Sequence, residues 1–265
     1  MPPAAKLPQR NCSKKMSRTD EWFEKEDFWC NFAPIMFDDA RWAEAPDVAE
    51  YVKKIANLKN GDSVLDAGCG LGRISVELAG LGLDVTGVDL IQAELDAARE
   101  SAEAEGVPLK LIKADLRNFS SDKKFDCAVN LYTSFGYCDC IEDDMLILKN
   151  ICNAIRDGGT FILECTSRES AIKYFTKGET FDRGGWHVAT DFGVVGAWEG
   201  LRSRWVLTDD NGNKIEHEFV QRLYSAPDLC KKLIECGFSS ANAYGEFDLS
   251  PYDENLRTMI IVAKK

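Results

Sequence analysis

The sequence has little of what marks metal-binding, membrane and nucleic-acid-binding proteins. Only 2 of its 265 residues are histidine, and among its 10 cysteines Cys138 and Cys140 form the one close pair. Because zinc sites need a fuller set of His and Cys donors, we expect no metal. No apolar run approaches the roughly 20 residues that cross a membrane. Acidic residues outnumber basic ones by 44 to 32, for a net charge of −12, which disfavours nucleic acid as a partner.

The scattered cysteines also bear on the compartment. Several fall inside apolar patterns and no secretory signal precedes them, which is typical of reduced cysteines in a cytoplasmic protein. With 265 residues and 45% hydrophobic composition, the chain can bury one large core, as a Rossmann-type domain with an insertion would. We therefore expect a soluble cytoplasmic protein without membrane partners, either a monomer or a homodimer.

The most informative stretch runs from Val64 to Arg73, where an apolar strand enters a loop with glycine at positions 68, 70 and 72 and then a helix. Glycine adopts backbone angles closed to other residues and lets a ligand lie directly on the main chain. A second apolar run, 85–88, ends in Asp89, where a doubly wound sheet keeps a carboxylate for ribose hydroxyls. These residues predict a nucleoside cofactor.

The order of the glycines discriminates between cofactors. A dinucleotide fingerprint, G-x-G-x-x-G, would need glycine at position 73, which is Arg73, so an NAD-dependent oxidoreductase is a disfavoured alternative. Asp66 stands just before the glycines, where its carboxylate would repel a pyrophosphate and attract a cofactor with ammonium and sulfonium charge. At these residues the chain resembles the class I S-adenosylmethionine-dependent methyltransferases, over roughly residues 46–166.

The resemblance implies S-adenosylmethionine as the cofactor and assigns residues to it. The first motif is carried by the stretch from Asp66 to Gly72, the ribose-binding acid is Asp89, and the adenine-side acid is Asp115. The expected cofactor-binding residues are Asp66, Gly68, Gly70, Gly72, Asp89, Asp115, Leu116 and Asn130.

Alternating strand and helix patterns predict the fold. They favour an α/β, Rossmann-like, seven-stranded doubly wound sheet built from residues 46–166 and 225–265. Between them, residues 167–224 are expected to form an antiparallel substrate flap after the fifth strand, with strands at 186–193, 198–207 and 215–223. Residues 1–18 are expected to be a disordered leader. Residues 19–45, rich in aromatics, should form a cap, as a docked helix, a lid over the cofactor, or both.

The loop after the fourth strand bears on the acceptor. In class I enzymes that methylate nucleobase amines or amides, this position reads Asn or Asp followed by Pro-Pro and an aromatic, whereas here Asn130 is followed by Leu-Tyr-Thr. The form Thr133-Ser134-Phe135-Gly136-Tyr137 instead resembles a small-molecule branch acting on amino groups of sugars and amino acids. We therefore predict methyl transfer to a small molecule, at an amine or a hydroxyl.

Candidate residues for that chemistry come from this loop and from the flap. His187 is the candidate general base, with Tyr132 as a second catalytic candidate. The expected substrate residues are Thr133, Phe135, Tyr137, Arg222 and Tyr224. Packing roles for Tyr132 and Phe135 remain open. So do two other functions, a tRNA or protein methyltransferase and a non-catalytic S-adenosylmethionine-binding protein.

Overall fold

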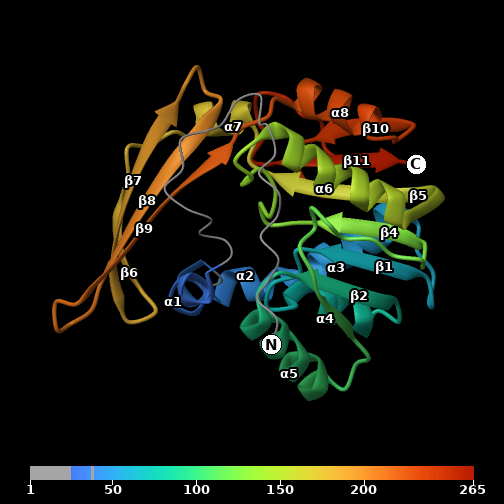
Figure 1. Cartoon of the computed structure of the whole chain (residues 1–265), viewed down its shortest axis with the longest axis horizontal. Coiled ribbons are helices and arrows are strands. Elements are labelled where there is room, and N and C mark those ends of the chain that lie inside the picture. The colour runs from blue at the N-terminus through green and yellow to red at the C-terminus, as the bar shows by residue number, and fades with distance from the viewer. Residues whose placement is uncertain (1–24, 37–38) are drawn as a thin grey trace.

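The computed structural model describes residues 25–36 and 39–265, so the predicted leader lies outside the described residues. Two sheets stand side by side (Figure 1), a seven-stranded sheet with helices on both faces and a four-stranded antiparallel sheet. Two short helices, α1 (Glu26–Met36) and α2 (Asp39–Ala43), lie between them.

The seven-stranded sheet has the order β10-β11-β5-β4-β1-β2-β3. Neighbouring strands among β1 to β5 run parallel, whereas β11 is antiparallel to both β5 and β10. Its strands are β1 (Ser63–Ala67), β2 (Asp84–Asp89), β3 (Lys110–Lys113), β4 (Phe125–Asn130), β5 (Ile155–Cys165), β10 (Ser240–Tyr244) and β11 (Met259–Lys264). The predicted Rossmann-like seven-stranded sheet is confirmed.

Helices cover both faces of this sheet because each presents one apolar stripe. On one face, α3 (Ala45–Ala56) and α4 (Arg73–Gly80) bury side chains such as Val52 and Leu78 against the strands. On the other face, α6 (Ile141–Ala154) and α8 (Ala226–Glu235) do the same with Leu148 and Leu229. The remaining helix of the parallel part, α5 (Gln92–Glu105), follows β2 and packs on α4 and on α1. The carboxyl ends of β1, β2 and β4 are thereby left free to carry a site.

The antiparallel sheet follows α7 (Arg168–Lys173) and has the order β6-β7-β8-β9. Its strands are β6 (Thr180–Arg183), β7 (Trp186–Val195), β8 (Gly200–Thr208) and β9 (Lys214–Arg222). Three of the four were expected, and β6 is the addition, too short to show an alternating pattern. Because side chains alternate between the two faces of a strand, one face carries Val188 and Leu207 and the other carries charged pairs such as Arg204 with Glu216.

Helix α1 joins the two sheets through an aromatic cluster. Phe28 and Phe32 stack with ring centroids 4.5 Å apart and are buried with Ile35 against Val188 and Leu207 of the antiparallel sheet. The end of α1 is tied down where Arg183 Nη1 of β6 donates to the carbonyl oxygen of Ile35 at 3.1 Å. The aromatic segment is therefore docked on the antiparallel sheet over its described part. Trp22, Phe23 and Phe37 lie outside the described residues.

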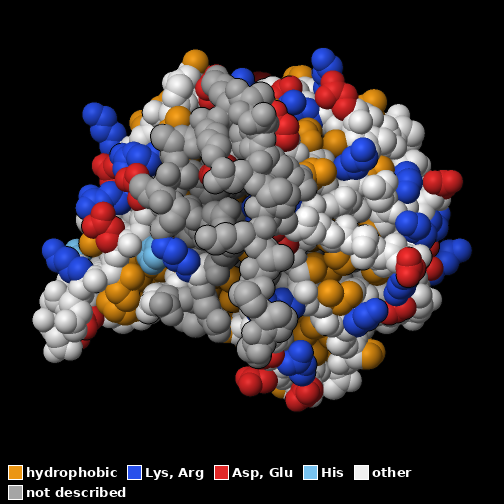
Figure 2. Space-filling model, in the orientation of Figure 1, with side chains coloured by type: hydrophobic (Ala, Val, Ile, Leu, Met, Phe, Trp, Pro, Cys, Tyr) orange, Lys and Arg blue, Asp and Glu red, His pale blue; other side chains and the backbone are white. Residues whose placement is uncertain are grey.

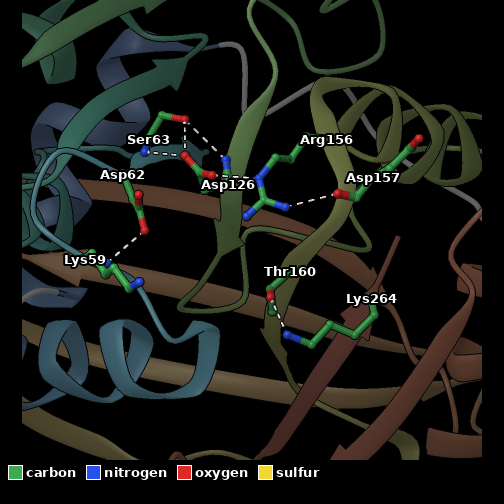
Figure 3. Close-up of polar contacts among 8 residues, drawn as sticks. All are labelled: Lys59, Asp62, Ser63, Asp126, Arg156, Asp157, Thr160 and Lys264. Atoms are coloured by element: carbon green, nitrogen blue, oxygen red, sulfur yellow. Dashed lines mark hydrogen bonds and ion pairs between the residues drawn. The ribbon is translucent and has the colours of Figure 1, made fainter.

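At the amino ends of β1, β4 and β5 the polar groups are matched to one another (Figure 3). Asp126 Oδ2 accepts from both the backbone N–H and the hydroxyl of Ser63 at 2.8 Å, and Asp126 Oδ1 accepts from Arg156 Nε at 2.7 Å. Beside them, Lys264 Nζ donates to the Thr160 hydroxyl at 2.6 Å. This end of the sheet is closed by internal pairs.

The structure also bears on three expectations from the sequence, which concern membrane-spanning helices, metal sites and the oxidation state of the cysteines. Within residues 25–36 and 39–265, no helix combines the length and apolarity needed to cross a bilayer. The same residues hold no group of three or more His, Cys, Asp or Glu placed to bind a metal ion. Seven described cysteines are free, but Cys140 is disulfide-bonded, so the expectation that every cysteine is reduced is wrong at that position.

Candidate cofactor and acceptor site

A cavity opens at the carboxyl ends of β1, β2 and β4, and the glycine loop forms its floor. Gly68 and Gly70 line the cavity with φ of +87° and +51°, in the left-handed region that favours glycine. Gly68 N–H donates to the carbonyl oxygen of Val88 at 2.7 Å, which fixes the loop against β2. Gly72 does not line the cavity. A side chain there would meet the Cβ of Ala98 at 2.6 Å, so this glycine serves the packing of α4 on α5.

Asp66 lies at the end of β1, buried to 4% exposure, and lines the cavity. Its Oδ2 accepts from the hydroxyl of Ser75 at 2.6 Å. Burial raises the pKa of Asp66 to about 6, opposed by the Ser75 bond and increased by the negative charge of Asp89. A carboxylate that is costly to ionise when alone is stabilised by a ligand that brings positive charge.

Asp89 ends β2 and reaches across to the glycine loop. Its Oδ2 accepts from Gly70 N–H at 2.8 Å, and its Oδ1 accepts from the N–H groups of Leu90 at 2.6 Å and Ile91 at 3.0 Å. Burial raises the pKa of Asp89, although these three bonds favour its ionised form. The carboxylate is held rigidly at the cavity wall, with lone pairs left to accept hydroxyl groups.

Asp115 and Leu116 follow β3 and complete the far wall of the cavity. Arg117, which also lines the cavity, forms an ion pair with Asp115, with Nε 2.8 Å and Nη2 2.7 Å from Oδ2 of Asp115. The side chain of Arg117 is 10% exposed and that of Asp115 is 19% exposed. The pair is rigid because both partners are largely out of water and joined by more than one bond.

The remaining wall is apolar and comes from two distant parts of the chain. Trp29 and Met36 of α1 and Trp42 of α2 line it, together with Tyr132 and Tyr137 of the loop after β4. Tyr132 and Thr133 have φ of +53° and +62°, which is strained for residues with a side chain. Glu164 of β5 holds the strained backbone, accepting Tyr132 N–H on Oε2 at 2.8 Å.

Comparison with known proteins shows which family of domains the glycine loop belongs to. Residues 64–159 match a family model described as a methyltransferase domain. The chain is an S-adenosylmethionine-dependent methyltransferase that carries this domain at residues 64–159. The residues present suit its cofactor, because the glycines open the floor and two rigid carboxylates face the cavity.

Two sequence relatives show how far the likeness extends. YqeM of Bacillus subtilis (strain 168), named as a methyltransferase, is 22% identical over 215 residues, or 76% of this chain and 84% of that protein. A ubiquinone biosynthesis O-methyltransferase of Rickettsia conorii is 28% identical over 123 residues, or 46% of this chain and 41% of that enzyme. The methyltransferase thus spans less than half the length of the second relative.

Solved structures share the fold over most of the chain. An S-adenosylmethionine-dependent methyltransferase from Clostridium acetobutylicum aligns with a TM-score of 0.74 at 19% identity, covering 89% of this chain and 98% of that one. The sugar N-methyltransferase KedS8 from a Streptoalloteichus species aligns with a TM-score of 0.67 at 18% identity, covering 97% and 100%. At these identities the likeness shows the fold alone.

Asn130 of the methyltransferase differs from its predicted place. It is 1% exposed, and its Nδ2 donates to the carbonyl oxygen of Ala67 at 2.5 Å, so it ties the end of β4 to the end of β1. A Cβ atom placed on Gly68 would lie 3.5 Å from Nδ2 of Asn130, so Asn130 packs against the glycine loop. Asn130 itself does not line the cavity. A role in direct contact with the cofactor is therefore not supported by its position.

Arg222 and Tyr224 are likewise not part of the cavity wall. Arg222 Nε lies 3.0 Å and the Tyr224 hydroxyl 2.7 Å from Oδ2 of Asp144, which is fully buried. Arg222 also binds the loop after β4, donating its backbone N–H to Gly136 O at 2.7 Å and its Nη2 to Asp139 O at 3.1 Å. These residues position the loop from behind instead of facing an acceptor.

Phe135 and His187 also depart from the prediction. Phe135 is 2% exposed and stacks on Tyr224 at 5.6 Å, which is the packing alternative that the sequence left open. His187 lies on the outer, charged face of the antiparallel sheet, with 60% of its side chain exposed and Nδ1 2.8 Å from Asp182. It does not line the cavity, so its position argues against a role as general base. Thr133 and Tyr137, in contrast, do line it.

Sequence reasoning missed several residues that line the cavity. Arg73 is 6% exposed, and its guanidinium lies 3.8 Å from the centre of the Tyr132 ring, a close cation–π contact. Glu94 of α5 is 4% exposed and also lines the cavity. The sequence did carry a signal for Glu94, because position 94 falls between Ile91 and Ala98 on the apolar face of its helix, where a charged residue is unexpected.

Proposed function

We propose that this methyltransferase acts on a small molecule, at an amine or a hydroxyl group. The observation that carries the proposal is the aromatic lining of the cavity. Trp29 and Met36 come from a helix that is packed against the antiparallel sheet, and they line the cavity together with Tyr132 and Tyr137. A cavity lined by several aromatic groups suits an acceptor that enters it in large part, which small molecules do and folded macromolecules do not.

The chemistry asks little of the protein beyond placement. The bound cofactor supplies an electrophilic methyl group on a sulfonium. The chain has to orient the acceptor and exclude water, and the rigid loop of Tyr132 and Thr133 is suited to do so. Burial raises the pKa of Tyr132 to about 12, against the opposing effect of Arg73, so this phenol stays protonated near neutrality. It can hold an acceptor by a hydrogen bond but cannot serve as a ready base.

An amine is the acceptor that fits this wall best. None of the described residues that line the cavity is a histidine, so no imidazole is placed to take a proton from the acceptor. An amine can lose its proton to solvent before it binds, and aromatic faces then stabilise the cationic product. Sugar N-methyltransferases such as KedS8 share the fold, which is consistent with this class of acceptor.

A macromolecular acceptor is the alternative to be tested. The chain carries a net charge of −12, and over the described part of the surface in Figure 2 basic and acidic side chains are interspersed. Binding to tRNA would need a basic surface to neutralise phosphates.

The test is to incubate the protein with cofactor carrying a deuterated methyl group and to identify every product by mass spectrometry. Acceptors are supplied as separate pools of amino sugars and amino acids, small phenols and alcohols, bulk tRNA, and unfractionated protein. We expect label in a small-molecule pool, with amines ahead of hydroxyls, and none in the other two. Label confined to tRNA or protein would overturn the proposal. The Asp89→Ala variant serves as the control for background transfer.

A further inference from the structure

Glu94 is a carboxyl group placed where the fold gains nothing from it. It is the third residue of α5, on the face that Leu95 and Ala98 bury against the sheet. A Cβ atom built on Gly70 would lie 3.8 Å from Oε2 and 3.9 Å from Oε1 of Glu94, so the carboxyl lies beside the glycine loop. It is 4% exposed and lines the cavity.

No group of the described chain satisfies this carboxyl in full. Oε1 of Glu94 is buried and has no hydrogen-bond partner. Burial and the neighbouring charge of Asp89 raise the pKa of Glu94 to about 8. The other titratable group facing it is the thiol of Cys69 in the glycine loop, whose pKa is itself raised by burial and by the charges of Asp66, Asp89 and Glu94. An unpaired buried polar atom costs stability unless a ligand completes it.

The position of Asp89 indicates which part of a ligand would do so. Asp89 already accepts three backbone N–H groups, which leaves it limited capacity for the two hydroxyls of a ribose. Glu94 interacts with Asp89 electrostatically and borders the same stretch of cavity wall, beside Gly70. Both carboxyls therefore border the region where the resemblance puts the ribose.

We propose that Glu94 is a second ribose-binding carboxyl in this methyltransferase, which shares the two ribose hydroxyls of the cofactor with Asp89. The proposal does not depend on the acceptor, because it concerns the cofactor side of the cavity only. A carboxyl in either protonation state can accept a hydrogen bond from a hydroxyl, and its amide counterpart can do the same. An apolar residue of similar length cannot.

The experiment measures binding alone. Calorimetry at pH 7 gives the Kd of S-adenosylhomocysteine and of its 2′-deoxy and 3′-deoxy analogues for the wild type, Glu94→Gln and Glu94→Met. We expect Glu94→Met to weaken S-adenosylhomocysteine about 10-fold and Glu94→Gln to stay within about 3-fold of the wild type. In the wild type, each deoxy analogue should bind more weakly than S-adenosylhomocysteine. In Glu94→Met, this difference should be clearly smaller for the analogue that lacks the hydroxyl bound by Glu94, because the protein partner of that hydroxyl is already absent.

Controls separate binding from folding. Glu103→Gln changes an exposed carboxyl on the same helix and should leave every Kd unchanged. The melting temperature of ligand-free Glu94→Met should equal or exceed that of the wild type, since the variant removes an unsatisfied buried group. Should Glu94→Met not fold, Glu94→Leu takes its place. The proposal is wrong if Glu94→Met binds S-adenosylhomocysteine as tightly as the wild type does. It is also wrong if removing either ribose hydroxyl from the ligand costs the same affinity in Glu94→Met as in the wild type.

Discussion

The two ends of the seven-stranded sheet carry similar carboxyl groups in opposite electrostatic settings. At the amino ends of the strands, burial alone would raise the pKa of Asp126, but the bonds from Ser63 and Arg156 outweigh it and the pKa is lowered. At the carboxyl ends, burial raises the pKa of Asp66 to about 6 and that of Glu94 to about 8, and the Ser75 bond and the charge of Arg73 offset only part of the shift at Asp66.

The difference separates groups that serve the fold from groups that await a ligand. A carboxyl whose partners are internal stabilises the chain by itself, as Asp126 does with Ser63 and Arg156. A buried carboxyl with a raised pKa destabilises the chain near neutrality, and it is retained at sites where binding compensates. The acids of the cavity therefore weaken the empty protein, and the matching acid at the other end does not.

The largest effect is expected from removing Asp89. Asp89→Ala should weaken S-adenosylhomocysteine by roughly 10-fold to 1000-fold, because bonds to a charged acceptor are worth about 1.5–3 kcal/mol each and each decade is about 1.4 kcal/mol. Calorimetry checks this, and a cooperative thermal transition of the ligand-free variant shows that it is folded. Asp126→Ala is the matched control at the opposite end and should leave the Kd unchanged. Normal binding by Asp89→Ala would contradict the ribose assignment.

Arg222 tests a carboxylate that lies at the ligand end but has an internal partner. Arg222→Ala leaves Asp144 buried and unpaired, and breaking such a pair costs about 3–5 kcal/mol. We expect a clear drop in stability by urea denaturation, and lower turnover because the loop at Gly136 is released. The affinity for S-adenosylhomocysteine should change little in the fraction that remains folded. If stability were unchanged and only turnover fell, Arg222 would belong to the acceptor site after all.

The pH dependence of the ligand-free protein gives an effect of intermediate size. Glu94 has a folded-state pKa of about 8 against an ordinary value of 4.5, and Asp66 one of about 6 against 3.8. Between each ordinary value and the raised value, the folded state binds more protons than the unfolded state. The contribution of these two groups to stability is therefore greatest below about pH 4 and falls as the pH rises toward 8. Differential scanning calorimetry should show a melting temperature that is lower by about 5 °C at pH 8 than at pH 5. Glu94→Gln should flatten this slope, and an unchanged slope would mean that Glu94 is ionised in the fold.

The smallest effect is expected at the opposite end of the sheet. Arg156→Ala removes a partner that is 51% exposed, so the ion pair with Asp126 is screened by water and is worth about 0.5–1 kcal/mol. The loss should be present above about pH 4 and should fade only as the pH falls through the folded-state pKa of Asp126, which lies below its ordinary value of 3.8. Denaturant melts at pH 7 and pH 2 provide the comparison. A loss that persisted at pH 2 would come from packing of the arginine stem.

Much of the cofactor side could be predicted from the sequence, because its residues are close together along the chain. Asp66, Gly68 and Gly70 fall on one strand and turn, and the end of the next strand brings Asp89 to them, so local pattern and sheet topology suffice. Gly72 and Asn130 show the limit of such motifs, since a motif position does not reveal which neighbour a residue meets. Glu94 was visible only as a charged residue on an apolar helix face.

The acceptor side could not be predicted in the same way, because it depends on the register of the antiparallel sheet. A shift of one residue moves a side chain from one face to the other, and the sequence alternates too imperfectly to settle it. His187 therefore appeared suitable for the site yet lies on the outer face, whereas His217 lies on the inner face, 4.9 Å from the ring of Phe28. Arg222 was likewise assigned to the acceptor because its buried partner, Asp144, is distant in sequence.

Helix α1 has a consequence for how this enzyme can diversify. One side of the helix presents Trp29 and Met36 to the cavity, and the other rests on the inner face of the antiparallel sheet through Phe28 and Phe32. Substitutions in that sheet can tilt or shift the cavity wall without altering any residue of the glycine loop. Under the proposed function, a new acceptor would therefore require changes in β7, β8 and β9 and none in the glycine loop.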